Sequence, residues 1–107
     1  MIMKKNLVLI STILMVACSA KIIMPSQADV ERANVKFPGI SLSDLNEGKI
    51  KFEQNCGSCH SLNESYHESE KGLRRIMPEM AQKAKIDAKA EDQILKYLIT
   101  MNSAPKK

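Results

Sequence analysis

Aromatic side chains are scarce in this chain, and their scarcity limits the hydrophobic core that it can build. Of the 107 residues, 44% are hydrophobic but only 4% are aromatic, with no Trp; the rings are Phe37, Phe52, Tyr66 and Tyr97. Such a length allows one small domain and excludes a multidomain enzyme, a solenoid and a membrane protein with several spans. The apolar content excludes a disordered chain. The net charge of +4 comes from basic residues dispersed among acids, a pattern that does not predict nucleic-acid binding.

The N-terminus resembles a bacterial export signal. Lys4 and Lys5 precede Leu7–Ala17, an uncharged and mostly apolar run of 11 residues. A run of this length suits the hydrophobic region of a signal peptide and is shorter than the roughly 20 residues of a membrane span. It ends at Met15-Val16-Ala17-Cys18, which resembles the lipobox of bacterial lipoproteins, in which the Cys receives lipid. We therefore expect a signal peptide over 1–17 and a lipid at Cys18.

Two other interpretations of the N-terminus remain open. Ordinary cleavage after Ala20 gives a signal peptide over 1–20 and a freely secreted domain. An uncleaved anchor over Leu7–Met24 is the other, although Lys21 interrupts its apolar run. All three interpretations place the domain outside the cytoplasm. The favoured one predicts a periplasmic domain that its N-terminal lipid anchors to a membrane.

The remaining sequence divides into a lead-in, a helical domain and a tail. Residues 18–38 show no clear periodicity and are predicted to be a tether, residues 39–104 are the predicted domain, and 105–107 are a tail. Val, Ile and Thr do not alternate with polar residues as strands require, so we expect an all-α fold of three to four helices.

Capping residues and apolar spacing set the expected helix positions. Ser41 and Ser43 are N-cap candidates for the first helix, and Asp87 can cap the last. Pro78 is expected to break or start the helix in between. The predicted helices span 44–55, 70–85 and 88–101, with a polar loop over 61–70.

The motif Cys56-Gly57-Ser58-Cys59-His60 follows the first predicted helix and carries the chemistry. C-x-x-C-H is the attachment sequence for c-type haem. Two thiols three residues apart, on about one helical turn, can each form a thioether with one haem vinyl group. The adjacent His60 is then carried under the ring, where its imidazole can ligate the iron. One covalent haem would also complete the core of 39–104, which is marginal in size on its own.

Other uses of this motif are less consistent with the sequence. A redox-active dithiol of the thioredoxin type belongs beside a βαβ pattern, and no strands are predicted here. A zinc site has only Cys56, Cys59, His60 and His67 to draw on, and the neighbouring residues 59 and 60 converge poorly on one tetrahedral ion. A chance occurrence in a structural loop is the third alternative.

An electron carrier also needs a second axial ligand, because six-coordinate iron reorganises little when an electron arrives. Met or His supplies it, and Met raises the reduction potential. The candidates are Met77, Met80, Met101 and His67. Met101 is late in the last helix and His67 is in a polar loop, so both are weaker candidates. Spacing alone does not choose between Met77 and Met80.

Two segments resemble class I cytochromes c. Gly48–His60 matches the family pattern G-x-x-x-[FY]-x-x-x-C-x-x-C-H, with Gly48 and Phe52 in the first two defined positions. Tyr97 matches the aromatic residue of the family's C-terminal helix, which crosses the first helix. The resemblance implies a small class I cytochrome c fold wrapped around one covalent haem c.

The second segment bears on the distal ligand. Met80–Ile86, followed by the last helix, resembles a subgroup of small bacterial monohaem cytochromes c in which the ligand Met precedes a Lys-Ala-x-[LI] stretch. The resemblance implies that Cys56 and Cys59 bind the haem and that His60 and Met80 ligate its iron.

The function implied is one-electron transfer between periplasmic or membrane redox partners, such as a respiratory complex, a dehydrogenase or a terminal reductase. No bond in a substrate would be made or broken, so an enzyme is not expected. The alternative is a haem-based sensor or gas-binding protein with an open or labile sixth coordination site. A subunit of a larger redox complex is a third interpretation.

Overall fold

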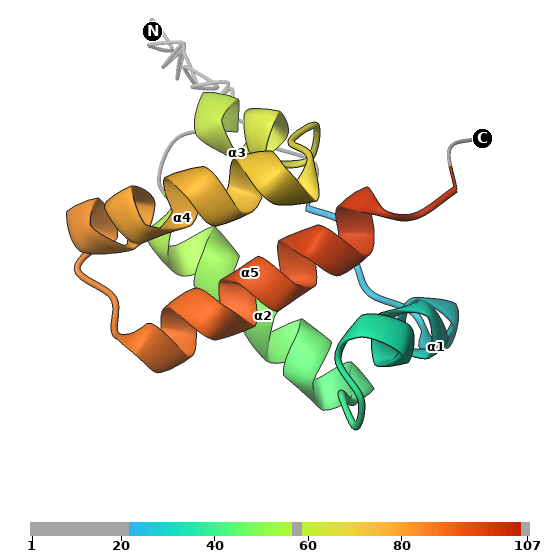
Figure 1. Ribbon diagram of the computed structural model, residues 1–107. Helices are drawn as coiled ribbons and strands as arrows, with labels where there is room; N and C mark the ends of the chain where they lie inside the picture. Colours follow the sequence, from blue (N-terminus) through green and yellow to red (C-terminus); the bar gives the residue numbers. More distant parts are fainter. Residues whose placement is uncertain (1–21, 57–58, 106–107) are drawn as a thin grey trace, which may run out of the picture.

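The computed structural model describes residues 22–56 and 59–105. The predicted signal peptide and the predicted lipid site at Cys18 lie outside these residues. No strand occurs in the described ranges, so the expected all-α class is confirmed. The helices, shown in Figure 1, are α1 (Gln27–Lys36), α2 (Leu42–Asn55), α3 (Cys59–Ser65), α4 (Glu70–Ala84) and α5 (Ala88–Asn102).

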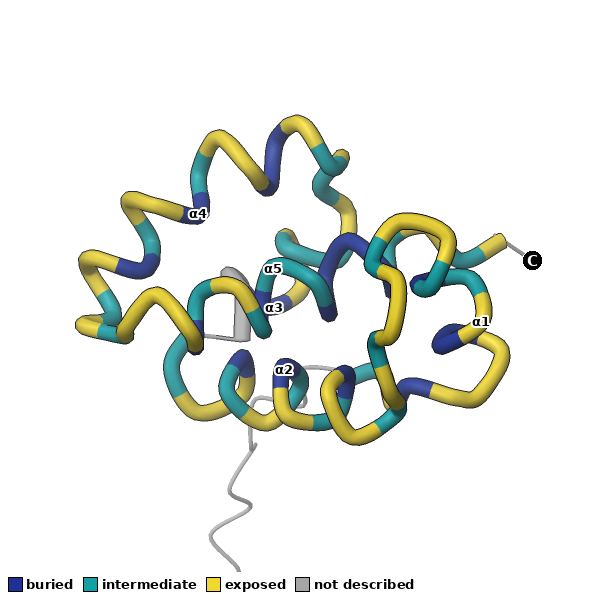
Figure 2. Tube along the Cα trace, turned by 60° about the horizontal axis from the view of Figure 1, so that its bottom comes forward, coloured by how far each residue is buried: buried dark blue, intermediate teal, exposed yellow. Residues whose placement is uncertain are grey.

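Helix α5 is the centre of the packing. It packs against α2 and α4. Helix α1 lies against α2 and α5 (Figure 1). In Figure 2, the buried positions of α2 and α4 lie on the sides that face α5. The most deeply buried side chains are Leu45, Phe52, Leu73, Ile94, Tyr97 and Leu98.

Helix α2 extends the prediction over 44–55 by two residues at its N-terminus. Ser41 is the N-cap: its Oγ accepts from the N–H of Asp44 at 3.1 Å, and its own N–H donates to the Asp44 carboxylate at 2.9 Å. This reciprocal capping satisfies two N–H groups that the helix leaves unpaired. Gly48 faces α5, where the absence of a side chain lets the two helices come into close contact.

Helix α4 corrects the expectation at Pro78. The helix begins after the N-cap Ser69 and continues through Pro78, rather than breaking or starting there. Proline removes one backbone hydrogen bond within a helix, but the apolar face of α4 stays packed on both sides of it, through Leu73 and Ala81. Helix α5 confirms the predicted cap, because the Asp87 carboxylate accepts from the N–H of Ala90 at 2.8 Å.

The lead-in differs most from the prediction of a tether over 18–38. Over its described part, 22–38, the chain contains helix α1 and packs against the domain. Ser26 and Asp29 form a capping box at its start. Val30 and Ala33 are buried against Leu45 of α2. A short helix of this kind is fixed by tertiary packing rather than by its own apolar periodicity, which is weak.

Helix α3 was also not expected, because 61–70 reads as a polar loop. Leu62 is buried in the core on this helix. The amide of Asn102, on α5, donates to the carbonyl oxygens of Ser65 at 2.7 Å and Glu68 at 2.9 Å. These bonds fix the end of α3 through a partner that is more than thirty residues away in the sequence.

A buried acid ties α1 to the end of α5. Asp29 is 8% exposed, and its carboxylate accepts from Arg32 at 2.7 Å. The same Arg32 guanidinium donates to the Thr100 carbonyl oxygen at 2.8 Å. Burial by itself raises the pKa of Asp29, but the hydrogen bonds from Arg32 and Ser26 outweigh it and leave that pKa below its usual value. The ionised carboxylate therefore stabilises the fold.

We expect Asp29→Asn to lower the free energy of unfolding at neutral pH by about 1–2 kcal/mol, since a charge-assisted pair and a cap are lost. The folded-state pKa lies below the unfolded value of 3.8, so the contribution is complete above pH 3.8 and disappears as the pH falls through the folded value. Urea unfolding of parent and variant across this range measures it. Glu31→Gln, an exposed change on the same helix, is the control. A difference between parent and D29N that persists at the lowest pH would contradict the charge argument.

Candidate cofactor site

The C-x-x-C-H motif lies at the junction of α2 and α3. Cys56 is the C-cap of α2, and its N–H donates to the Phe52 carbonyl oxygen at 3.0 Å. Its free thiol is half-buried and packs against the main core. Cys59 and His60 are the first residues of α3, but their side chains lie outside what the structure describes. Of the three haem-binding residues predicted in this motif, the structure therefore describes the side chain of Cys56 and only the backbone of Cys59 and His60.

A small apolar cavity brings Cys56 together with the two candidate methionines. Met77 and Met80 both line it from α4, although they are more than twenty residues from Cys56 in the sequence. Its volume is ≈30 Å³. The remaining lining residues are Phe52, Ser65, Leu73, Ile76 and Leu98.

The four candidates for the distal ligand now differ in position. Met77 is 5% exposed and is part of the main core, whereas Met80 is half-buried and lines the same cavity without belonging to that core. Met101 is buried on α5 and His67 is exposed, and neither lines the cavity. Both methionines thus lie on one face of α4, and Met80 is less deeply buried than Met77.

The protonation of Cys56 bears on the dithiol alternative. Burial raises the pKa of its thiol above the ordinary value. An attacking cysteine of a dithiol oxidoreductase needs the opposite shift, because the thiolate is the nucleophile. Cys56 is thus a protonated thiol at neutral pH, in an environment that is unsuited to disulfide exchange.

The residues that line the cavity are of the types that a haem site needs, but the cavity itself is too small to hold a haem. A thiol, two thioethers and an apolar lining are the groups that would attach, ligate and enclose a porphyrin. The cavity is far below the ≈300–1,000 Å³ of ligand pockets, so a group of that size requires α4 to shift. Among the described helices, α4 makes its main contact with α5.

Comparisons with protein-family models, curated proteins and solved structures gave no match.

Three aromatic rings border the site on the side of the lead-in. The ring of Phe52 contacts Tyr66 edge-on, with centroids 5.5 Å apart, and Tyr97 at 6.0 Å. The hydroxyl oxygens of Tyr66 and Tyr97 are 2.7 Å apart. Burial, followed by the hydrogen bond with Tyr66, raises the pKa of Tyr97 well above its usual range. Sequence analysis found Phe52 and Tyr97 but not Tyr66, since it falls in a stretch predicted to be a loop.

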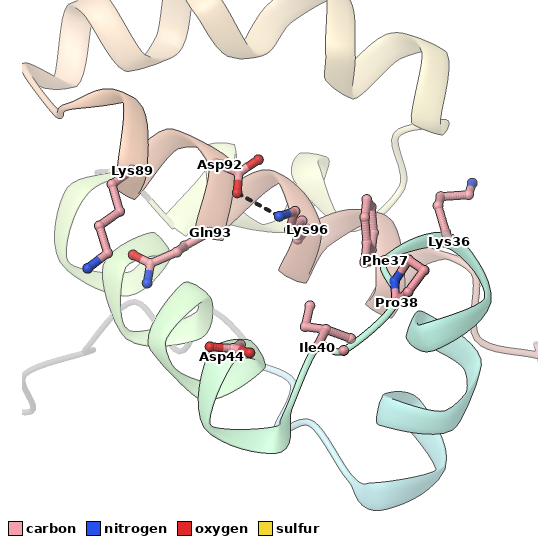
Figure 3. Close-up of a pocket in the computed structure, with 10 residues that line it drawn as sticks. Lys36, Phe37, Pro38, Ile40, Asp44, Lys89, Asp92, Gln93 and Lys96 are labelled. Atoms are coloured by element: carbon pink, nitrogen blue, oxygen red, sulfur yellow. Dashed lines mark ion pairs between the residues drawn. The ribbon is translucent and has the colours of Figure 1, made fainter.

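A second and larger hollow lies elsewhere on the molecule. Figure 3 shows this groove of ≈550 Å³ between α5 and the connection from α1 to α2. Asp92 and Lys96 of α5 form an ion pair at 2.8 Å on its wall, and Lys96 also lies over the Phe37 ring, 5.6 Å from the centroid. It shares no lining residue with the Cys56 cavity. We assign it no ligand.

Among the residues that the structure describes, no three His, Cys, Asp or Glu side chains gather as a metal-ion site. No helix within 22–56 or 59–105 combines the length and the apolar character that crossing a bilayer requires.

Proposed function

We propose that this protein is a one-electron carrier of the class I cytochrome c type. Cys56 and Cys59 attach one haem c, His60 ligates its iron from one side and Met80 from the other. A lipid at Cys18 anchors the domain to a membrane outside the cytoplasm. Its partners are other redox proteins, and it transforms no substrate of its own.

The observation that supports this proposal best is the meeting of Cys56 with Met77 and Met80 in one apolar cavity. The attachment motif and the candidate sulfur ligands lie on different helices, α2 and α4, yet fold to a common point. A cysteine of the motif and a methionine at one point are what attachment of a haem and ligation of its iron require.

The bound haem supplies an iron that alternates between Fe(II) and Fe(III). The chain's own residues set the conditions for this exchange. Two axial side chains keep the coordination number fixed, which limits reorganisation, and a thioether ligand raises the reduction potential. Phe52, Leu73 and Leu98 exclude water from one wall of the site. The thioethers at Cys56 and Cys59 would mark the side of the domain on which a redox partner makes brief contact through a small interface.

The first test is optical. Spectra of the haem-matured chain are recorded oxidised, reduced, and reduced with carbon monoxide. We expect covalent haem whose reduced spectrum is low-spin and unchanged by carbon monoxide. Rapid conversion by carbon monoxide would favour the sensor or gas-binding alternative, and the absence of covalent haem would exclude both functions.

A further inference from the structure

The four residues before Ser26, the N-cap of α1, are bound to the core instead of leading away from it. The N–H of Ile23 donates to the Tyr66 hydroxyl at 3.2 Å, and the Tyr97 hydroxyl donates to the Ile23 carbonyl oxygen at 2.5 Å. Because the single hydroxyl proton of Tyr97 is used there, Tyr66 donates to Tyr97 at 2.7 Å. Three hydrogen bonds thus close a ring between Ile23 and the two tyrosines.

Apolar packing fixes the same segment, residues 22–25, which we call the strap. Ile22 and Ile23 pack against the main core, and Pro25 is buried. Met24 lies between them with 66% of its surface exposed. The strap therefore holds the chain at a fixed point on the domain and presents one large apolar side chain to its surroundings.

Chain length then limits how far Cys18 can lie from the domain. Three residues, Ser19 to Lys21, separate Cys18 from Ile22, and the four Cα–Cα steps between these two residues span about 14 Å when fully extended. A free tether over 18–38 would instead reach about 70 Å by the same measure. The strap shortens the reach about fivefold.

We propose that the strap holds the domain directly against a lipid surface, on a leash of three residues between Cys18 and Ile22. This inference rests on the proposed lipid at Cys18. Met24 is placed to contact the lipid, because it is the exposed apolar side chain at the exit point. Tyr66 joins the strap to Phe52, one turn before Cys56, so the leash also keeps the cofactor site near the membrane. The redox partner of such a site is a protein embedded in, or bound to, the same membrane.

The test measures the position of the lipidated, haem-loaded chain above a bilayer. Neutron reflectometry is performed on a supported bilayer of phosphatidylethanolamine and phosphatidylglycerol. The parent is expected to form a protein layer against the headgroups, without a resolved water layer. Inserting twelve Gly and Ser residues between Ala20 and Lys21 should open a water layer of about 20 Å, the mean span of such a linker. The same insertion between Ala104 and Pro105 should leave the layer in place.

A second variant tests the strap itself. Replacing both tyrosines, Tyr66→Phe with Tyr97→Phe, removes the two hydroxyls that bind Ile23, so that the strap detaches more often and the leash then extends to Ser26, where α1 is capped. Hydrogen exchange at the Ile23 amide should become at least tenfold faster, and the protein layer should move outward. Faster exchange without outward movement would mean that the strap does not set the distance.

The outcomes distinguish failure of the leash from failure of the proposed lipid anchor and of the proposed electron transfer. If the mass of the mature chain shows no lipid at Cys18, the anchor and the leash are both wrong, while the haem spectrum still tests electron transfer. If the lipid is present but the parent already stands off behind a water layer, or the insertion at Ala20 changes nothing, the leash alone is wrong.

Discussion

Replacing Gly48 with Ala is expected to lower the free energy of unfolding by about 3 kcal/mol or more. The added methyl group would meet atoms in or next to the backbone of α5, which cannot move aside as a flexible side chain can. A Cβ at this position would lie 2.8 Å from the Cβ of Tyr97 and would collide with the carbonyl oxygen of Gln93. Both atoms belong to, or adjoin, the backbone of α5. The helices must separate to admit the methyl group, and the contact that they share is the centre of the core. Urea unfolding of the mature chain, followed by circular dichroism, measures the change.

Gly72→Ala is the matched control. A Cβ at Gly72 meets only the Glu68 carboxylate, at 2.8 Å, which is the far end of a flexible side chain. Since Gly72 lies within α4, its replacement should be neutral or stabilising by up to about 1 kcal/mol through helix propensity. If the two variants unfold alike, the close contact between α2 and α5 does not have the importance that the structure gives it.

Replacing Met80 with Leu is expected to open the sixth coordination site of the proposed haem. Leu matches Met in volume, so the fold should lose less than about 1.5 kcal/mol, but it cannot ligate iron. The reduced variant should then bind carbon monoxide, whereas the parent is expected not to bind it. Its reduction potential should fall on the order of 0.1 V, because a thioether ligand favours the reduced state. A carbon monoxide titration and a redox titration provide the two measurements.

Met77→Leu is the control for this variant, because Met77 lies on the same face of α4 and lines the same cavity. It should keep the parent spectrum and resist carbon monoxide. If M77L binds carbon monoxide and M80L does not, Met77 is the ligand. If neither variant binds it, the sixth ligand is neither methionine, and the assignment of both is wrong.

The helices that could be predicted from the sequence are those in which several local signals agree. Helices α2, α4 and α5 were each predicted within two residues at either end, because a capping residue precedes an apolar face at helical spacing. Only the effect of Pro78 was misjudged, since tertiary packing on either side of it outweighs one lost hydrogen bond. For the candidate site, the motif pointed to Cys56 and the resemblance to Met80, and the structure brings these two residues to one cavity.

The features that were missed depend on partners far away in the sequence. The strap is fixed by tyrosines that lie 43 and 74 residues further along the chain from Ile23. The end of α3 is fixed by Asn102 in the same way. No local pattern in a short polar stretch reports contacts of this range. The capping box of Ser26 and Asp29 was the one local signal for α1, and it stood in a segment without a clear apolar face.

Pro78 has a consequence for the order in which the mature protein is assembled. Proline lacks the N–H that would bond to the carbonyl of Arg74, so α4 lacks one backbone hydrogen bond beside the cavity. The contact between α2 and α5 does not involve this helix and can form first. For the proposed haem, an α4 that closes last would leave the Cys56 thiol open to attachment until the cofactor is in place. Maturation would then be a one-way step, in which closure of α4 follows haem insertion and seals it.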